Sequence, residues 1–144
     1  MDNIDLKILD ILQTDGRVTM KELGQRVGLT SPATIERVKK LEESGIIGGY
    51  RAVIDVALAG LPVRAYLFVS LVGQPVAAFF DFVRDHNGLI ACHRLAGGAS
   101  YLLEAAVADT AALESLLDQL APFGQVETHM VLSTPIPPKK LTLP

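Results

Sequence analysis

Apolar residues near the start of the chain recur every three or four positions, which is the spacing of one face of an α-helix. Ile4, Ile8 and Leu12 form such a stripe, and the pattern predicts a first helix over residues 2–14. Two more stretches with helical spacing follow before residue 45. The chain is therefore expected to open with three short helices.

The second helix has clear start and end signals. Thr19 and Glu22 stand at the spacing of a capping box, in which each side chain accepts a hydrogen bond from a free amide at the helix start. Gly28 marks the end, because glycine readily takes the left-handed conformation that closes a helix. The third helix starts after Thr30 or Ser31. Its expected buried stripe consists of Ile35, Val38 and Leu41.

Two short helices joined by a tight turn, with an extended segment over residues 50–56 behind them, are typical of a winged helix-turn-helix. Between residues 17 and 40 six basic side chains accompany two acidic ones, a local charge of +4 in a chain of net charge −3. Such a patch would attract DNA phosphates. A helical hairpin that only packs, with a solvated basic face, is the alternative. The residues expected to contact DNA are Ser31, Ala33, Glu36 and Arg37 near base edges, Lys40 and Arg17 on phosphates, and Thr30 beside them.

Beyond a linker at residues 57–61 the pattern changes to short apolar runs rich in β-branched and aromatic residues. Strands are predicted near residues 65–72, 89–95, 101–107 and 126–132, and helices near 75–87 and 109–120. The order β-α-β-β-α-β is that of a ferredoxin-like fold, in which two helices cover one face of an antiparallel sheet. The expected fold class is α+β, with a winged helix-turn-helix at residues 1–56 and a βαββαβ domain at residues 62–144.

One face of the predicted sheet has no helix to cover it. Tyr66, Phe68, Ser70 and Val72 alternate onto that face, which is apolar enough to need a partner. A second copy of the same sheet is the simplest partner, so we expect a homodimer. The proline-rich end, IPPKKLTLP, is expected to drape over another subunit or to stay mobile.

Composition excludes several classes of protein. There is no run of 18 apolar residues and no basic, apolar leader, so neither a membrane span nor an export signal is expected. The lone cysteine, Cys92, fits a reducing compartment, and we expect a cytoplasmic protein. His86, His93 and His129 are too scattered for a zinc site. Cys92 and His93 would point to opposite faces of a strand, so no catalytic pair, cofactor or metal is expected.

Three motifs resemble the Lrp/AsnC family of transcriptional regulators. They are DxxDxxIL at the chain start, GLTSPAT before the third helix, and IERVKKLEESGIIGGY through it. The resemblance continues through the βαββαβ part. It implies double-stranded DNA as a partner, and a small effector, typically an amino acid, bound between dimers of a ring-like octamer. Dimer and octamer both stay open.

In that family the effector site surrounds the turn between the second and third strands, where the pattern is a glycine, two variable residues, an aspartate and an aromatic. The matching residues here are Gly97, Gly98, Ala99, Ser100 and Tyr101. Ser100 replaces the aspartate, which argues against a strongly basic effector. Thr128 and Met130 are the expected opposite wall. The alternative is that this stretch only forms a hairpin turn and has no role in binding an effector.

The resulting expectation is a sequence-specific DNA-binding transcriptional regulator modulated by a small effector, and not an enzyme. One alternative is an architectural protein that binds DNA with little specificity. Another is a tetrapyrrole decarboxylase of the same two-part fold, for which His93 and Arg94 would have to serve.

Overall fold

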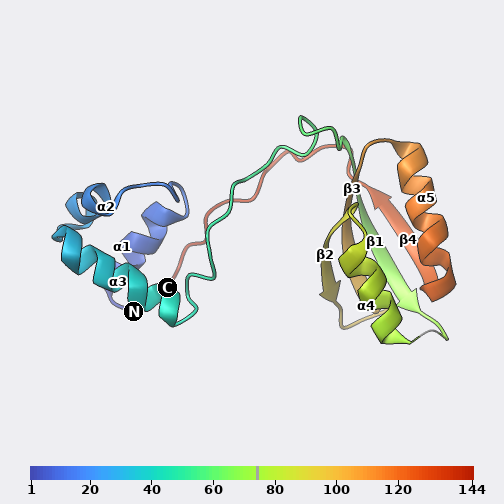
Figure 1. Cartoon of the computed structure of the whole chain (residues 1–144), viewed down its shortest axis with the longest axis horizontal. Coiled ribbons are helices and arrows are strands. Elements are labelled where there is room, and N and C mark those ends of the chain that lie inside the picture. The colour runs from blue at the N-terminus through green and yellow to red at the C-terminus, as the bar shows by residue number, and fades with distance from the viewer. Residues whose placement is uncertain (74) are drawn as a thin grey trace. The chain divides into compact units, whose positions relative to one another are not determined.

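The computed structural model describes residues 1–73 and 75–144. Contacts divide the chain into two compact units (Figure 1). The first contains Met1–Val53 together with Ile136–Pro144, and the second contains Ile54–Pro135. We call the helical part of the first unit, residues 1–53, the head, and residues 136–144 the tail. Within the described ranges no helix is long and apolar enough to cross a membrane.

The head contains the three expected helices, α1 (Asn3–Leu12), α2 (Met20–Val27) and α3 (Ser31–Glu43). The capping box of α2 is confirmed, because Thr19 and Glu22 each accept a hydrogen bond from the other's backbone amide. Gly28 closes α2 with a φ of +76°, as expected. Thr30 caps α3 without a side-chain hydrogen bond.

The buried stripe of α3 differs from the expected one. Thr34, not Ile35, lies inward with Val38 and Leu41, while Ile35 is 51% exposed. Thr34 is fully buried, and its hydroxyl donates to the Thr30 carbonyl at 2.9 Å. The prediction of Ile35 was wrong because only the small threonine fits against α2 at Gly24. A Cβ on Gly24 would lie 2.7 Å from both the Leu29 carbonyl oxygen and the Thr34 Oγ1.

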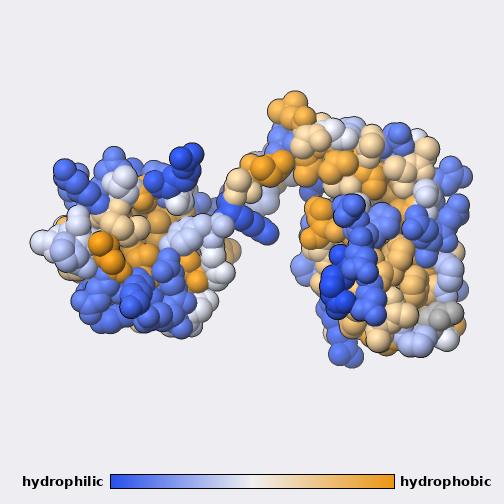
Figure 2. Space-filling model, in the orientation of Figure 1, coloured by the Kyte–Doolittle hydropathy of each residue, from blue (hydrophilic) through white to orange (hydrophobic). Residues whose placement is uncertain are grey.

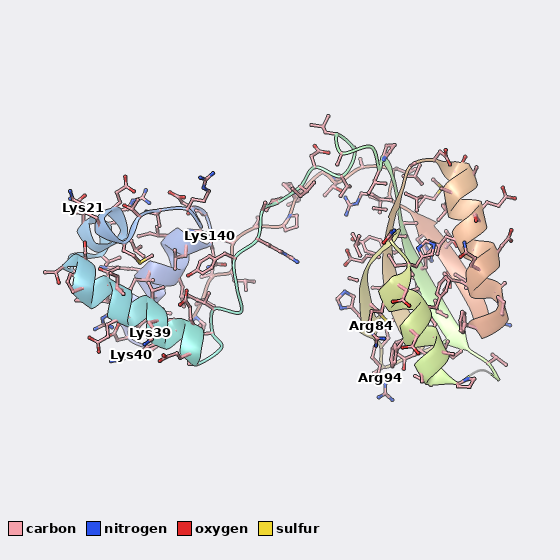
Figure 3. The ribbon with its side chains drawn as sticks, in the orientation of Figure 1. Lys21, Lys39, Lys40, Arg84, Arg94 and Lys140 are labelled. Atoms are coloured by element: carbon pink, nitrogen blue, oxygen red, sulfur yellow. The ribbon has the colours of Figure 1, made fainter. Side chains whose placement is uncertain are left out.

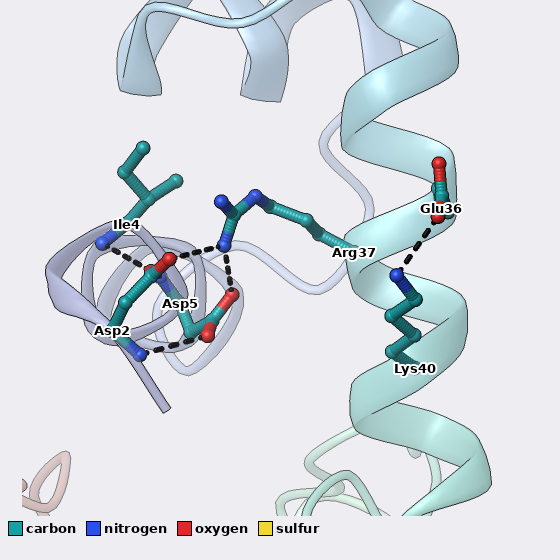
Figure 4. Close-up of polar contacts among 6 residues, drawn as sticks. All are labelled: Asp2, Ile4, Asp5, Glu36, Arg37 and Lys40. Carbon is teal, nitrogen blue, oxygen red and sulfur yellow. Dashed lines mark hydrogen bonds and ion pairs between the residues drawn. The ribbon is translucent and has the colours of Figure 1, made fainter.

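An ion pair ties the start of α1 to the middle of α3 (Figure 4). Arg37 Nη1 lies 2.7 Å from Asp2 Oδ2 and 2.8 Å from Asp5 Oδ1. Asp2 is also the N-cap of α1, accepting from the amides of Ile4 and Asp5 at 2.9 Å. Its pKa falls from 3.8 to about 2, first because of the Asp5 amide and then because of Arg37. We call Asp2, Asp5 and Arg37 the clamp.

Both ends of the first unit lie outside helices and strands. Residues 48–55 belong to no helix or strand, so the extended segment expected as a wing makes no β-ladder within the described chain. The tail was expected to cover another subunit or to stay mobile. Instead it packs against the head of its own chain, where Leu143 joins the apolar cluster that contains Ile8 and Leu9.

The second unit confirms the βαββαβ order. Its elements are β1 (Val63–Leu71), α4 (Val76–Asp85), β2 (Leu89–Arg94), β3 (Tyr101–Val107), α5 (Thr110–Leu120), a single 3-10 turn (Ala121–Phe123) and β4 (Gly124–Met130). The antiparallel sheet has the order β2-β3-β1-β4. This alternation of helices and strands gives the α+β class that was expected.

Both helices of the second unit cover one face of the sheet. The core contains inward residues of β1 and β3 with Leu113, Leu116 and Leu120 of α5 and Phe79 of α4. On α4, Phe79 is fully buried, whereas Val76 and Phe80 are 45% and 37% exposed. Apolar residues also reach the surface of both units (Figure 2). Val53 and Leu58, on either side of the boundary between the units, are almost fully exposed.

Replacing Gly24 with alanine should destabilise the head. The added methyl meets a backbone carbonyl that cannot move freely, and overpacking of this kind costs about 1–3 kcal/mol. Urea denaturation followed by helical circular dichroism measures the loss. Gln25→Ala, one position along on the exposed face of α2, is the control and should change little. A Gly24→Ala protein as stable as the parent would mean that α2 and α3 are less closely packed.

Acid should weaken the clamp. The pKa of Asp2 is lower in the folded state than its usual value, so its contribution to stability is complete above about pH 4 and disappears as the pH falls towards 2. Asp2→Asn keeps a capping side chain but removes the charge. Its melting temperature should lie below that of the parent at pH 5, and the gap should close by pH 2. Asp118→Asn, on the exposed face of α5, should show no such gap.

Candidate functional site

The exposed face of α3 carries two pairs of opposite charges. Lys40 Nζ lies 2.8 Å from Glu36 Oε1 (Figure 4), and Lys39 Nζ lies 3.5 Å from Glu43 Oε1. Figure 3 labels both lysines on α3. All four side chains are more than 60% exposed. The hydrogen bond from Lys40 lowers the pKa of Glu36. Exposed pairs of this kind are weak, so both lysines can exchange these partners for others.

The residues expected to contact DNA occupy different environments. Glu36 and Lys40 point outward from α3, and Thr30 is exposed at its start, while Ser31 and Ala33 are half-buried there. Arg17 is exposed in the turn between α1 and α2. Arg37 differs from all of these, since both carboxylates of the clamp hold it and raise its pKa.

Sequence reasoning missed two exposed residues on α3. Ile35 was assigned to the core, and Lys39 was not singled out. Lys39 lies four positions before Glu43, and this i, i+4 spacing of opposite charges is itself a sign of an exposed helix face.

The second unit has a cavity of about 430 Å³ on the sheet face that no helix covers. Its walls come from β1, β4 and the turn between β2 and β3. The lining residues are Phe68, Ser70, Leu95, Ala96, Gly97, Gly98, Ala99, Gln125 and Glu127. We call this cavity the sheet-face pocket.

The turn at the sheet-face pocket is fixed at one end. Ser100 donates its amide to the Val69 carbonyl and accepts from the Leu95 amide, both at 2.9 Å. The Ser70 hydroxyl contacts the Gly98 carbonyl at 3.4 Å. Among the described residues, the amides of Gly97, Gly98 and Ala99 donate to no backbone carbonyl. Gly97 has a φ of +149°, a conformation that suits glycine.

Glu127 gives the sheet-face pocket its carboxylate. Its Oε1 lies 2.8 Å from His129 Nε2, and the His129 ring packs edge-on against Phe68, with 5.3 Å between centroids. Phe68 and Glu127 stand opposite each other in the β1–β4 register, so their side chains share a face of the sheet.

Several residues expected at the effector site lie outside this pocket. Thr128 is paired with the buried Leu67, which puts it on the helix-covered face. Met130 lies two positions later on β4 and is therefore on the same face. Tyr101 is buried and packs against Phe79 and Phe80, with centroid distances of 5.2 and 5.4 Å. The pocket thus unites Gly97, Gly98 and Ala99 with Gln125 and Glu127. Gln125 and Glu127 follow from the strict alternation of side chains between the two faces of β4, once that strand is placed in register with β1.

No three histidine, cysteine, aspartate or glutamate side chains gather into a metal-binding group among residues 1–73 and 75–144. Cys92 faces the core, and burial raises the pKa of its thiol. His93 lies 3.6 Å from Glu104 at the surface.

Comparison with protein families assigns both units. Residues 1–47 match the model described as winged helix-turn-helix DNA-binding, and residues 64–141 match the Lrp/AsnC ligand binding domain. The first match covers α1–α3, and the second includes the whole sheet-face pocket.

Similar proteins match most of the chain. The HTH-type transcriptional regulator LrpC of Bacillus subtilis is 32% identical over 92% of each chain. The leucine-responsive regulatory protein of Haemophilus influenzae is 36% identical over 81% of this chain and 72% of that one.

Solved structures show the same architecture. The structure of B. subtilis LrpC covers 96% of this chain and 99% of its own, with a TM-score of 0.91 and 32% identity. The Neisseria meningitidis transcriptional regulator NMB0573, in complex with L-Met, covers 100% of this chain and 96% of its own, with a TM-score of 0.89 and 31% identity. With its helix-turn-helix, its ligand-binding fold and these relatives, the chain belongs to the Lrp/AsnC family and is a DNA-binding transcriptional regulator.

Proposed function

We propose that α3 enters the major groove of double-stranded DNA and that its exposed face determines the operator. The observation that carries this proposal is the position of Lys39 and Lys40 on the outer face of the second helix of a helix-turn-helix. An α-helix fits the major groove, and lysines along its edge can reach phosphates. On binding, Lys40 would exchange its ion pair with Glu36 for one with DNA phosphates, because the Lys40–Glu36 pair is exposed.

The contacts divide by chemistry. We assign Thr30, Ser31, Ala33 and Glu36 to base edges or the backbone close to them. Lys40 and Arg17 are assigned to phosphates, together with Lys39. Arg37 was expected at a base edge, but we now assign it a positioning role, since leaving Asp2 and Asp5 would uncouple α3 from α1.

We propose that the sheet-face pocket binds an amino acid effector. Glu127 would face the ligand ammonium, and the amides of Gly97, Gly98 and Ala99 would face its carboxylate. Phe68 offers an apolar wall for the side chain. The similar regulator from N. meningitidis was solved with L-Met, which fits a ligand of this class.

The working protein is proposed to be a dimer or a higher assembly in the cytoplasm. Tyr66, Phe68 and Leu102 are half-buried on the sheet face without a helix over them, and a second sheet would cover them. An octamer of such dimers is the assembly that the family resemblance implies. Residues 1–56 would serve as the DNA-reading part, residues 57–61 as the linker, and residues 62–144 as the effector and assembly part, the tail excepted.

Two other functions fit the site less well. An architectural role needs no ligand pocket, whereas the second unit has a cavity with a carboxylate in its wall. An enzymatic role for His93 and Arg94 has only exposed side chains at the end of β2 to support it. We therefore propose no catalytic activity.

Lys40→Ala should weaken DNA binding at every sequence to a similar degree. One phosphate contact fewer per head reduces the slope of log affinity against log salt by about 0.9 for each head that binds. An operator selected from a random DNA pool and fluorescence anisotropy at several salt concentrations measure this slope. Arg84→Ala removes an equally exposed charge from α4 and is the matched control. An unchanged slope for Lys40→Ala would remove Lys40 from the interface.

Glu127→Gln should weaken the response to an amino acid effector while leaving the shape of the pocket intact. In the parent protein, an effector at a hundredfold excess over its dissociation constant raises stability by about 2.7 kcal/mol. Losing a charge-assisted hydrogen bond weakens binding about 10- to 100-fold. Thermal melting against all twenty amino acids at millimolar concentration tests both statements.

Glu104→Gln is the control for this experiment, because Glu104 pairs with His93 and does not line the pocket. A parent protein whose melting temperature responds to none of the twenty would contradict an amino acid effector. A response of Glu127→Gln as large as that of the parent would place the ammonium elsewhere.

A further inference from the structure

Ile35 is a large apolar side chain on the outer side of α3. It is the fifth residue of that helix, and it is 51% exposed. Among the described residues it belongs to neither of the two apolar clusters of the chain. Thr34, directly before it, and Val38 are the residues that α3 buries. Ile35 therefore contributes little to the packing of the head.

Two other exposed residues share a face of α3 with Ile35. Pro32 lies three positions before it and Lys39 four positions after it, which are the spacings of neighbours on a helix surface. Lys39 is one turn farther along the axis, about 6 Å. If Lys39 contacts a phosphate, Ile35 lies nearer the start of the helix, which is the part of a recognition helix that contacts base edges.

An isoleucine can recognise only one feature of the major groove. Its side chain neither donates nor accepts a hydrogen bond, whereas most of the groove edge consists of donors and acceptors. The exception is the C5-methyl group of thymine, which is apolar and reaches into the groove. Against a G·C pair, the same side chain would bury donors and acceptors without partners, at a cost in free energy.

The branched side chain also suits a fixed contact. A β-branched residue in a helix has one strongly preferred χ1 rotamer, so Ile35 is held in nearly one position before DNA binds. It therefore loses little conformational entropy when it packs against a base. A long flexible side chain such as that of Lys39 loses more.

We propose that Ile35 determines part of the operator sequence by packing against the C5-methyl group of a thymine. The inference rests on the proposed entry of α3 into the major groove, and it names the base that this residue reads. Lys39 and Lys40 supply the attraction for phosphates, which is independent of sequence. Ile35 adds no charge to that attraction, so its contribution is to the choice of base.

Replacing thymine with uracil tests the contact, because it removes the methyl group and leaves the hydrogen-bonding groups of the base unchanged. An operator is selected from a random DNA pool with the parent protein, and each thymine is then replaced in turn, in both half-sites. Fluorescence anisotropy at one fixed salt concentration measures the affinity. At the position that Ile35 reads, uracil should weaken binding by the parent about fourfold for each half-site, the effect of burying one methyl-sized group.

Ile35→Ala shows which methyl group this side chain contacts. At one position in each half-site the variant should bind the thymine and uracil forms equally well. Alanine favours a helix more than isoleucine does, and Ile35 lies outside the core, so α3 should keep its fold. Ile46→Ala is the matched control, because it removes a similarly exposed isoleucine just beyond α3 and should keep the full sensitivity to uracil.

A methylated cytosine provides the reverse experiment. Replacing the T·A pair at the same position with C·G should weaken binding by the parent protein. 5-Methylcytosine puts the methyl group back at C5, and it should recover about fourfold of the loss for each half-site. Ile35→Ala should gain nothing from the added methyl group.

The outcomes distinguish this inference from the proposed function. A parent protein that selects no sequence from the pool overturns operator reading by α3, and the role of Ile35 with it. Specific binding without any effect of uracil overturns the role of Ile35 alone, and so does an effect that Ile35→Ala leaves unchanged at every position. An effect that disappears at one position in Ile35→Ala, and persists there in Ile46→Ala, supports the contact with thymine.

Discussion

The rotation of α3 about its own axis depends on one close approach between helices. Gly24 has no side chain, so α2 comes near enough for the Leu29 carbonyl and Thr34 Oγ1 to fill the space where a Cβ would lie. Thr34 is thereby turned inward, and Val38 and Leu41 follow it into the core. The opposite side of the helix, with Glu36 and Lys40, is then necessarily the side that faces solvent.

Local signals explain which parts of the fold could be predicted from sequence. Thr19, Glu22 and Gly28 define the limits of α2 through bonds within a few residues, and the strands follow from their own apolar runs. The inward residue of α3 could not be predicted in this way, because Thr34 and Ile35 both keep a helical spacing with Val38. Hydrophobicity favoured isoleucine, and the contact with Gly24, distant in sequence, decided for threonine.

The candidate site could be predicted only in part from the sequence, for the same reason. The resemblance located Gly97–Ala99, but the other wall depends on the register between β1 and β4, which brings Glu127 opposite Phe68. Arg37 was expected to contact DNA because it is basic and lies on α3. Its partners Asp2 and Asp5 are more than thirty positions away, beyond any local pattern. The place of the tail on the head is a long-range contact of the same kind.

The two sides of α3 are under different constraints. Thr34, Val38 and Arg37 are fixed by Gly24, by the apolar cluster and by the clamp. Ala33 and Glu36 contribute to none of these attachments. Substitutions at those two positions can therefore change which operator is preferred while the helix keeps its place. Relatives with this scaffold can diverge in the genes they control through a few outward residues, with little effect on folding.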